Sequence, residues 1–289
     1  MDYSQSIGII GYGEVGKVFT EGLRQNQDLK IHVYDVLTQQ GREDILMDIK
    51  RQGAIPEMSI RDLVHAADTI FVLVNSSAIS DVIASIIEAM EKPIIVIDFT
   101  TSSPHTKQNC SNRLQNEHCE AVYIDAAIMG TVATEGFQVP ILFASHNEDA
   151  MSTIKNNLQM NVSILVEQVG TAASIKLIRS VFMKGLEALV LESMTAAKKY
   201  NVENNVLESI STTLNNNDFK HFAEALIKTH VIHKMRRYKE VIDSMKLLED
   251  ANIEPYVSEG VRSFFEYSVK KEIRNTDSVD EILMAYGGK

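Results

Sequence analysis

Short apolar runs alternate with amphipathic stretches over the first 166 residues of the chain. Seven runs are rich in β-branched residues and have the length of strands: Ser6–Ile10, Ile31–Tyr34, Thr69–Val74, Ile94–Ile97, Val122–Ile124, Ile141–Ala144 and Ser163–Val166. Between them apolar residues recur with a helical period, as in Val15–Leu23, Ile79–Met90 and Ala150–Leu158. Strands that alternate with helices imply crossover connections and a largely parallel sheet. Because the runs are almost continuously apolar, we expect helices to cover both faces.

The pattern changes after Gly170, where only the helical period continues. Ala172–Asn201 contains no proline and predicts a helix of roughly 45 Å, long enough to leave one domain and enter another. Further helices are expected at Val202–Leu214, Phe219–Thr229, Lys234–Ala251, Ser258–Arg274 and Val279–Ala285. The sequence therefore predicts an α/β protein: a doubly wound sheet in residues 1–168, then an all-helical domain in residues 169–289, joined by the long helix.

Composition narrows the class of protein. The chain has 289 residues, of which 45% are hydrophobic and 23% charged, which is typical of a globular protein of two domains. Its formal charge of −11 argues against general binding of nucleic acid. We expect no secretory signal and no membrane span, because the first residues carry no basic and apolar segments and every apolar run is short. Two sparse cysteines, Cys110 and Cys119, favour a reduced, cytoplasmic protein without a structural metal site.

The strongest motif is the glycine pattern Gly11–Gly16. It follows the first expected strand and opens an amphipathic helix, which is the context that a dinucleotide site of Rossmann type requires. In such a site Gly11 makes the tight turn, Gly13 lets the backbone approach the pyrophosphate, and Gly16 lets helix and strand pack closely. The helix N-terminus then faces the phosphates. The residues expected at the cofactor are Gly11, Tyr12, Gly13, Glu14, Val15 and Gly16; the alternative is a glycine-rich turn without a ligand.

An acid after the second strand indicates which dinucleotide binds. Asp35 lies nineteen residues after Gly16, where a carboxylate accepts hydrogen bonds from ribose hydroxyls and repels a 2′-phosphate. NAD is therefore favoured as cofactor, and the nearby Arg42 keeps NADP possible. The alternative is that Asp35 only caps the loop before Arg42.

Two further strand ends point to the same crevice, since ligands bind beyond the carboxyl ends of parallel strands. Val74 and Asn75 follow one run, and Thr100 follows another. We expect these three residues to contact the cofactor. Ser77 and Ser103 are interpreted instead as caps of the helices that follow.

Four segments resemble the β-hydroxyacid dehydrogenase superfamily, which includes 3-hydroxyisobutyrate and 6-phosphogluconate dehydrogenases. They are Gly11–Gly16, Asp98–Thr101, Asp125–Gly130 and Gly170–Lys176, and the resemblance spans about two-thirds of the chain. It implies an NAD(P)-dependent oxidoreductase that moves a hydride between the cofactor and a small hydroxy or keto acid. It also implies that Lys176 faces the nicotinamide as general acid and base, with Glu192 at the family's spacing. A branch with a helical C-terminal domain of poorly defined function is the most similar part of the superfamily.

The chemistry implied for Lys176 is sensible in itself. Hydride reduction of a carbonyl needs a proton at the developing alkoxide, and a lysine ammonium with a lowered pKa both stabilises that charge and supplies the proton. The alternative is a solvated lysine on a helix surface.

Departures from the superfamily point to an unusual substrate. Where many members carry Ser-Gly-Gly to hold a substrate carboxylate, this chain has Met129, Gly130 and Thr131. Where they carry Asn four residues after the lysine, it has Ser180. The substrate is therefore not the usual small hydroxy acid, or it is held differently.

Basic residues farther along offer other substrate contacts. Lys184 lies eight residues after Lys176, on roughly the same helix face. His230, His233, Lys234 and Arg237 share a face if their segment is one helix, and in an acidic chain this cluster is a candidate anion site. A solvated helix face is the more ordinary interpretation, and a metal site is not expected.

Three functions stay open at this point. They are an NAD-linked dehydrogenase acting on a small anionic substrate, an imine-reducing enzyme on the same architecture, and a sensor that binds NAD without turnover. By analogy with the superfamily, we expect a homodimer formed through the helical domain.

Overall fold

The computed structural model describes residues 5–25, 28–216, 218–273, 276 and 278–287. The chain forms two compact units, residues 1–179 and residues 180–289. The division falls inside helix α9 (Thr171–Lys199), so this helix contributes residues to both units.

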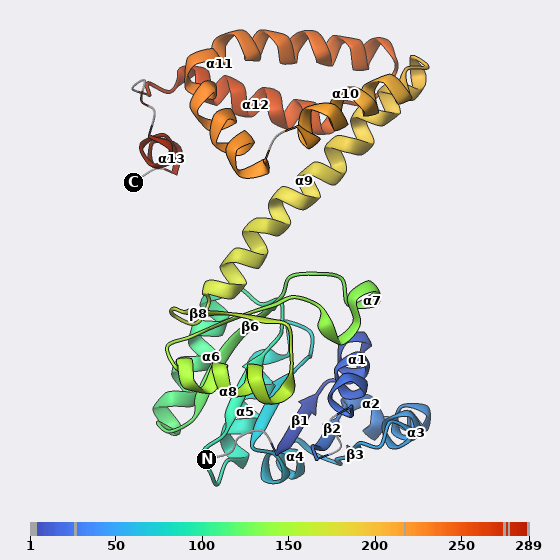
Figure 1. The fold of residues 1–289 in the computed structure, drawn as a ribbon, viewed down its shortest axis with the longest axis vertical. Helices are drawn as coiled ribbons and strands as arrows, with labels where there is room; N and C mark the ends of the chain where they lie inside the picture. The colour runs from blue at the N-terminus through green and yellow to red at the C-terminus, as the bar shows by residue number, and fades with distance from the viewer. Residues whose placement is uncertain (1–4, 26–27, 217, 274–275, 277, 288–289) are drawn as a thin grey trace. The chain divides into compact units, whose positions relative to one another are not determined.

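The first unit is built on an eight-stranded sheet with the order β3-β2-β1-β4-β5-β6-β7-β8 (Figure 1). Its strands are β1 (Ser6–Ile10), β2 (Lys30–Tyr34), β3 (Ile55–Pro56), β4 (Thr69–Val72), β5 (Ile95–Asp98), β6 (Val122–Ile128), β7 (Ile141–Ser145) and β8 (Val162–Val166). All neighbours are parallel except β6 and β7. The strand order reverses between β1 and β4, the place where doubly wound sheets open a crevice for ligands. The predicted α/β fold is confirmed.

Helices cover both faces of this sheet, as the apolar strands predicted. They are α1 (Glu14–Leu23), α2 (Val36–Gln39), α3 (Glu43–Arg51), α4 (Ile60–Ala66), α5 (Ile79–Ala89), α6 (Pro104–Glu117), α7 (Val132–Glu135), the 3-10 turn η1 (Gly136–Gln138) and α8 (Glu148–Leu158). Side chains that alternate along a strand enter opposite cores. On β4, Phe71 packs in one core, whereas Ile70 and Val72 pack in the other.

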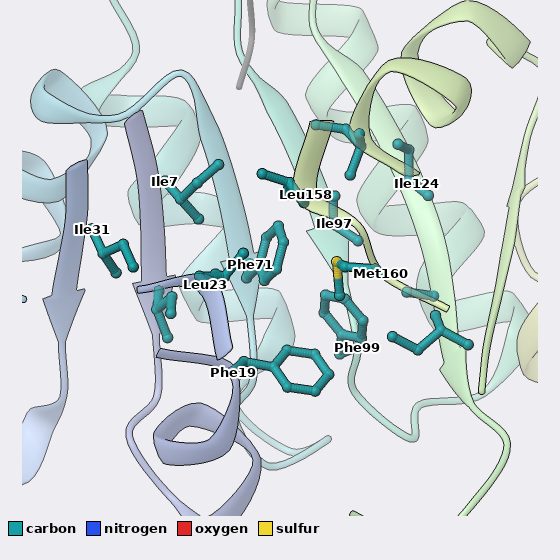
Figure 2. Packing of buried hydrophobic residues seen from close by; sticks show 14 of the residues in the cluster. Ile7, Phe19, Leu23, Ile31, Phe71, Ile97, Phe99, Ile124, Leu158 and Met160 are labelled. Carbon is teal, nitrogen blue, oxygen red and sulfur yellow. The ribbon is translucent and has the colours of Figure 1, made fainter. Parts of the chain in front are cut away.

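The core that contains Phe71 lies under the glycine loop. Figure 2 shows Phe19 of α1 beside Phe71, which lies in β4, and Phe99, which follows the neighbouring strand β5. The ring centroid of Phe19 lies 6.4 Å from that of Phe71 and 5.3 Å from that of Phe99, both edge-to-face. These contacts fix α1 on the sheet and so hold the loop before it.

The described residues of the second unit form the end of α9, α10 (Glu203–Asn215), α11 (Phe219–Asp250), α12 (Tyr256–Lys270) and α13 (Val279–Gly287). Phe219–Thr229 and Lys234–Ala251, predicted as two helices, are one helix, because neither proline nor glycine interrupts the residues between them. Arg274, the predicted end of the next helix, lies outside the described residues. No helix in the described ranges is long and apolar enough to cross a membrane.

Candidate active site

The glycine loop has the shape that its sequence predicted. Gly11 adopts a φ of 102°, and a Cβ there would lie 2.6 Å from the carbonyl oxygen of Leu73 on the neighbouring strand connection. A Cβ on Gly16 would collide with the carbonyl oxygen of Gly11. Both positions therefore require glycine, Gly11 for its backbone conformation and Gly16 for close packing.

The N-terminus of α1 is open beside Gly13. This residue is the N-cap of α1, and it has no side chain with which to bond the first-turn amides. Apart from Gly13 and its two chain neighbours, no described residue has a heavy atom within 4 Å of the place where a Cβ of Gly13 would be. Free amides and open space beside a helix N-terminus fit the pyrophosphate of a dinucleotide.

Asp35 joins the second strand to this loop. Its carboxylate accepts the backbone N–H of Tyr12 at 2.6 Å and that of Leu37 at 2.9 Å. The first bond ties Asp35 to the glycine loop, and the second caps the N-terminus of α2. Capping leaves the carboxylate further lone pairs for ribose hydroxyls, so both interpretations made from the sequence are compatible with its geometry.

Arg42 is held by a neighbouring acid. Its guanidinium forms a bidentate contact with Asp44, at 2.8 and 2.7 Å. Both residues line a hollow of about 500 Å³ that also includes Tyr12, Gly13 and Glu14. The arginine that could meet a 2′-phosphate beside the glycine loop is thus already paired.

The strand ends around the crevice differ in what they offer. Val74 lies beside Gly11, whose added Cβ would be 3.3 Å from its Cγ1. The carbonyl of Asn75 accepts the N–H of Ala78. Thr100 is buried, and its hydroxyl bonds the Ser102 hydroxyl at 2.7 Å.

The two serine caps have different outcomes. Ser103 bonds the N–H of Thr106 at 3.0 Å and caps α6, as predicted. The prediction for Ser77 is wrong, because α5 begins after Ala78, which is its N-cap. The turn between Asn75 and Ala78 delays the start of the helix by one residue.

Three charged side chains are fully buried together: Asp98 at the end of β5, Asp125 in the middle of β6 and Lys107 on α6. The Lys107 Nζ lies 2.8 Å from Oδ1 of Asp125 and 3.6 Å from Oδ2 of Asp98, which are paired across the two strands. It also donates to the carbonyl oxygens of Asp98 and Ala126. The sequence pattern singled out the strand segments with the two acids but missed Lys107.

Lys176 lies half-buried near the start of α9, next to this cluster. The other oxygen of Asp125 accepts the N–H groups of Gly170 and Ala173, both at 3.0 Å, and so holds the start of the helix against β6. Burial lowers the pKa of Lys176, repulsion from Lys107 lowers it further, and attraction to Asp125 opposes both. A lysine in this environment is suited to exchange a proton.

Backbone N–H groups at the end of β6 and in the loop after it are already bonded to other parts of the chain. Glu135 of α7 accepts the N–H of Thr131 at 2.7 Å, and a Cβ on Gly130 would collide with the same carboxylate. The N–H of Met129 donates to the carbonyl of Pro140. Two amides that the resemblance implied for a substrate carboxylate are therefore already bonded. Sequence reasoning missed Glu135, which no motif marks.

The remaining candidate substrate residues belong to the second unit: Ser180, Lys184, His230 and Arg237. His230 bonds the Ser268 hydroxyl at 2.7 Å and packs among the rings of Phe264, Phe265 and Tyr286. Burial lowers its pKa, with further lowering by Arg237 and Lys234.

Lys234 and Arg237 of the basic cluster also make internal contacts. Lys234 donates to the carbonyls of Ser268 and Lys271 at the end of α12, and Arg237 donates to the Thr229 hydroxyl at 2.8 Å. The bonds of His230 and Lys234 hold α12 against α11, and the bond of Arg237 lies within α11, so these contacts favour a structural role for the three residues.

Glu192 also has a structural partner within the second unit. Its carboxylate accepts the N–H groups of Val257 and Ser258, at 2.8 and 3.0 Å, and the Ser258 hydroxyl. It therefore caps the N-terminus of α12. The resemblance marked its position in the sequence without indicating this contact.

Comparison with known families identifies the first unit. Residues 6–169 match the NAD binding domain of 6-phosphogluconate dehydrogenase. The chain belongs to this family, and its first unit is an NAD-binding domain. Residues 197–268 match a domain of unknown function, DUF1932.

Individual relatives are distant. An uncharacterized 28.5 kDa protein of Methanothermus fervidus is 22% identical over 262 residues, which are 90% of this chain and 98% of the relative. A solved conserved protein of unknown function, described as structurally similar to 3-hydroxyacid dehydrogenases, is 24% identical with a TM-score of 0.62, covering 91% and 96% of the two chains.

A second solved structure has a more similar fold at lower identity. An imine reductase variant from Myxococcus stipitatus in complex with NAD+ is 16% identical with a TM-score of 0.78, covering 97% of this chain and 99% of its own. At such identities, these similarities establish the fold that the chain shares with dehydrogenases and imine reductases.

Proposed function

We propose that the protein is an NAD-linked oxidoreductase that interconverts a small hydroxy acid and its keto or semialdehyde form, with Lys176 as general acid and base. The observation that carries this proposal is the half-buried Lys176, whose pKa is lowered by burial and by Lys107. Lysines are solvated and fully charged on most helix surfaces, and a lowered pKa suits proton transfer near neutral pH.

Each part of the first unit would have one task in this reaction. The N-terminus of α1 would bind the pyrophosphate, and Asp35 would bond the adenosine ribose. Bound NADH supplies the hydride that reduces the substrate carbon. The Lys176 ammonium would donate its proton to the substrate oxygen as negative charge develops there, and in the oxidative direction the neutral amine would take that proton back.

NAD is the proposed cofactor in preference to NADP. The carboxylate of Asp35 would repel a 2′-phosphate. Arg42 is the cation best placed to neutralise such a phosphate, but its guanidinium is bonded to Asp44. Both features disfavour the extra negative charge of NADP.

Reduction of an imine is the second candidate function, and Glu135 supports it. The Glu135 carboxylate occupies the N–H of Thr131 and lies against Gly130, so the loop presents negative charge where a substrate carboxylate would be expected. Negative charge there would repel a hydroxy acid and would attract a protonated imine. The imine reductase of Myxococcus stipitatus, whose fold is similar, is consistent with this alternative.

A substrate screen separates these functions. We would incubate the protein with NADH or NADPH and a panel of keto acids, semialdehydes and cyclic imines, and follow the loss of reduced-cofactor fluorescence. Lys176→Ala is expected to keep its NADH affinity and to lose roughly 100-fold or more in turnover, as for removal of a general acid. Lys155→Ala, which removes a half-buried lysine of α8, is the matched control and should keep full turnover.

Each other result has a definite meaning. Full turnover by Lys176→Ala would refute the role of Lys176. Tight NADH binding without turnover of any compound would favour a sensor. Turnover of imines alone would replace the first candidate by the second.

We further propose that the protein is a homodimer formed through its helical unit. Every residue of α9 from 181 to 191 is exposed, although many of these side chains are apolar. A helix that is apolar on all sides is normally buried. A second copy of the chain would provide the missing cover.

A further inference from the structure

Lys107 is a fully buried cation that packing alone does not require. An apolar side chain of similar size would pack α6 against the sheet without the loss of hydration that a buried ammonium suffers. Two acids share the same site, so its net charge remains negative. Hydrogen bonds compensate: Tyr123 and the N–H of Thr100 donate to Asp98, at 2.6 and 2.8 Å. Such a cluster requires an explanation beyond stability.

Asp125 connects Lys107 to the start of α9. One of its carboxylate oxygens pairs with Lys107, and the other accepts the N–H groups of Gly170 and Ala173. Lys176 follows Ala173 by three residues, about one helical turn farther along. The ion pair between Lys107 and Asp125 therefore fixes the carboxylate on which the first turn of α9 is anchored.

The same pair determines the charges that act on Lys176. Among the described residues, the charged groups that influence its ammonium are Lys107 of α6, which repels it, and Asp125 of β6, which attracts it, with the repulsion the larger effect. Asp98, the third member of the cluster, is paired with Lys107 and Tyr123.

We propose that Lys107 is a positioning residue for Lys176: through Asp125 it holds the turn that carries Lys176, and its own positive charge disfavours a second ammonium beside it. The proposal rests on the proposed role of Lys176 in catalysis. It explains why a cation is buried where an apolar residue would pack, and it makes the charge of Lys176 depend on two residues that do not contact the substrate.

The test measures the pKa of the Lys176 amine directly, in the protein without substrate. Trace acetylation by acetic anhydride over a range of pH, followed by peptide mass spectrometry, reports the uncharged fraction of each lysine. Four proteins are compared: wild type, Lys107→Met, Asp125→Asn, and the double variant. The Asp125→Asn substitution keeps a side-chain oxygen for the two amides of α9 but removes the negative charge.

Repulsion from Lys107 and attraction to Asp125 predict one order of pKa values. Asp125→Asn is the lowest because only the repulsion remains, then wild type, then the double variant, and Lys107→Met is the highest because only the attraction remains. The double variant has no charge at either position. If Lys107→Met alone fails to fold, the pKa of Lys176 in the double variant is compared with that in Asp125→Asn and in wild type. Lys92→Met, which removes an exposed ion pair with Asp68, should not move the value.

An unchanged or lowered pKa in both variants that lack Lys107 would overturn the proposal. Displacement of Lys176 has a separate readout, which requires a substrate from the screen. At saturating NADH the kcat of Lys107→Met should fall about 100-fold, as for a displacement near 1 Å. If the pKa order holds but Lys176→Ala keeps its turnover, the proposed function is wrong and the link between Lys107 and Lys176 stands. If Lys176→Ala is inactive and the order fails, only the role of Lys107 is wrong.

Discussion

Single hydrogen bonds at the residue scale set the cofactor preference that we propose. The Arg42 guanidinium lowers the pKa of Asp44 to about 2, so this exposed pair is charged at neutral pH. Asp44→Ala would release Arg42 to meet a 2′-phosphate, and we predict that the ratio of NADPH to NADH affinity rises about tenfold, as for one charge-assisted hydrogen bond. Fluorescence titration with each reduced cofactor measures the ratio. Asp149→Ala, which removes an exposed acid of α8, is the control, and an unchanged ratio in Asp44→Ala would show that Arg42 does not reach the cofactor.

The lowered pKa of Lys176 also predicts how turnover depends on pH. In the reductive direction the ammonium is the active form, so kcat should fall as the pH rises through a pKa below that of an ordinary lysine. In the oxidative direction the neutral amine is active, and kcat should rise through the same pKa. Both profiles can be recorded with one substrate pair. An alkaline decrease only at the pKa of a solvated lysine would contradict the assignment.

At the scale of elements, the sequence predicted the strands and helices whose apolar residues recur with a regular period. The seven predicted strands follow from apolar runs rich in β-branched residues, whereas β3 pairs through only Ile55 and Pro56 and is too short to give a pattern. Helix α6 was predicted only through its cap, Ser103, and not from an apolar period. Its buried positions have helical spacing, but two of the four are polar: Lys107, Cys110, Ser111 and Leu114. The same polarity that weakened the apolar period also concealed Lys107 as part of the site.

The candidate site also contains a part that the sequence predicts and a part that it does not. The glycine loop and Asp35 were predictable because a short motif and its spacing mark them in the sequence. The contacts of Lys107 with Asp125, and of Asp125 with α9, join residues that are far apart along the chain. No local pattern expresses such contacts, so they became visible only once the sheet had aligned β5 with β6.

Glu192 of α9 caps a second helix, α12, and this contact gives a prediction about stability. Its carboxylate replaces the missing side-chain cap at α12, whose N-cap residue is Pro255. Glu192→Ala should lower the free energy of unfolding of the helical unit by about 1–2 kcal/mol, as for loss of a helix cap. Urea unfolding followed by circular dichroism measures this. Glu187→Ala, at an exposed position of the same helix, should change stability little, and equal losses in the two variants would argue against capping.

At the scale of the whole molecule, the exposed stretch of α9 predicts a second copy of the chain. Val181 is 76% exposed and Leu191 is 64% exposed, and burial of such side chains stabilises an interface by roughly 1.5–3 kcal/mol each. Sedimentation at micromolar concentration should therefore show about twice the 32.3 kDa of one chain. Leu191→Lys should shift the protein toward the monomer, whereas Asp149→Lys, at an exposed position of α8 outside the helical unit, should leave the dimer intact. A wild-type monomer at that concentration would refute the dimer, and α9 would then need a different partner to cover it.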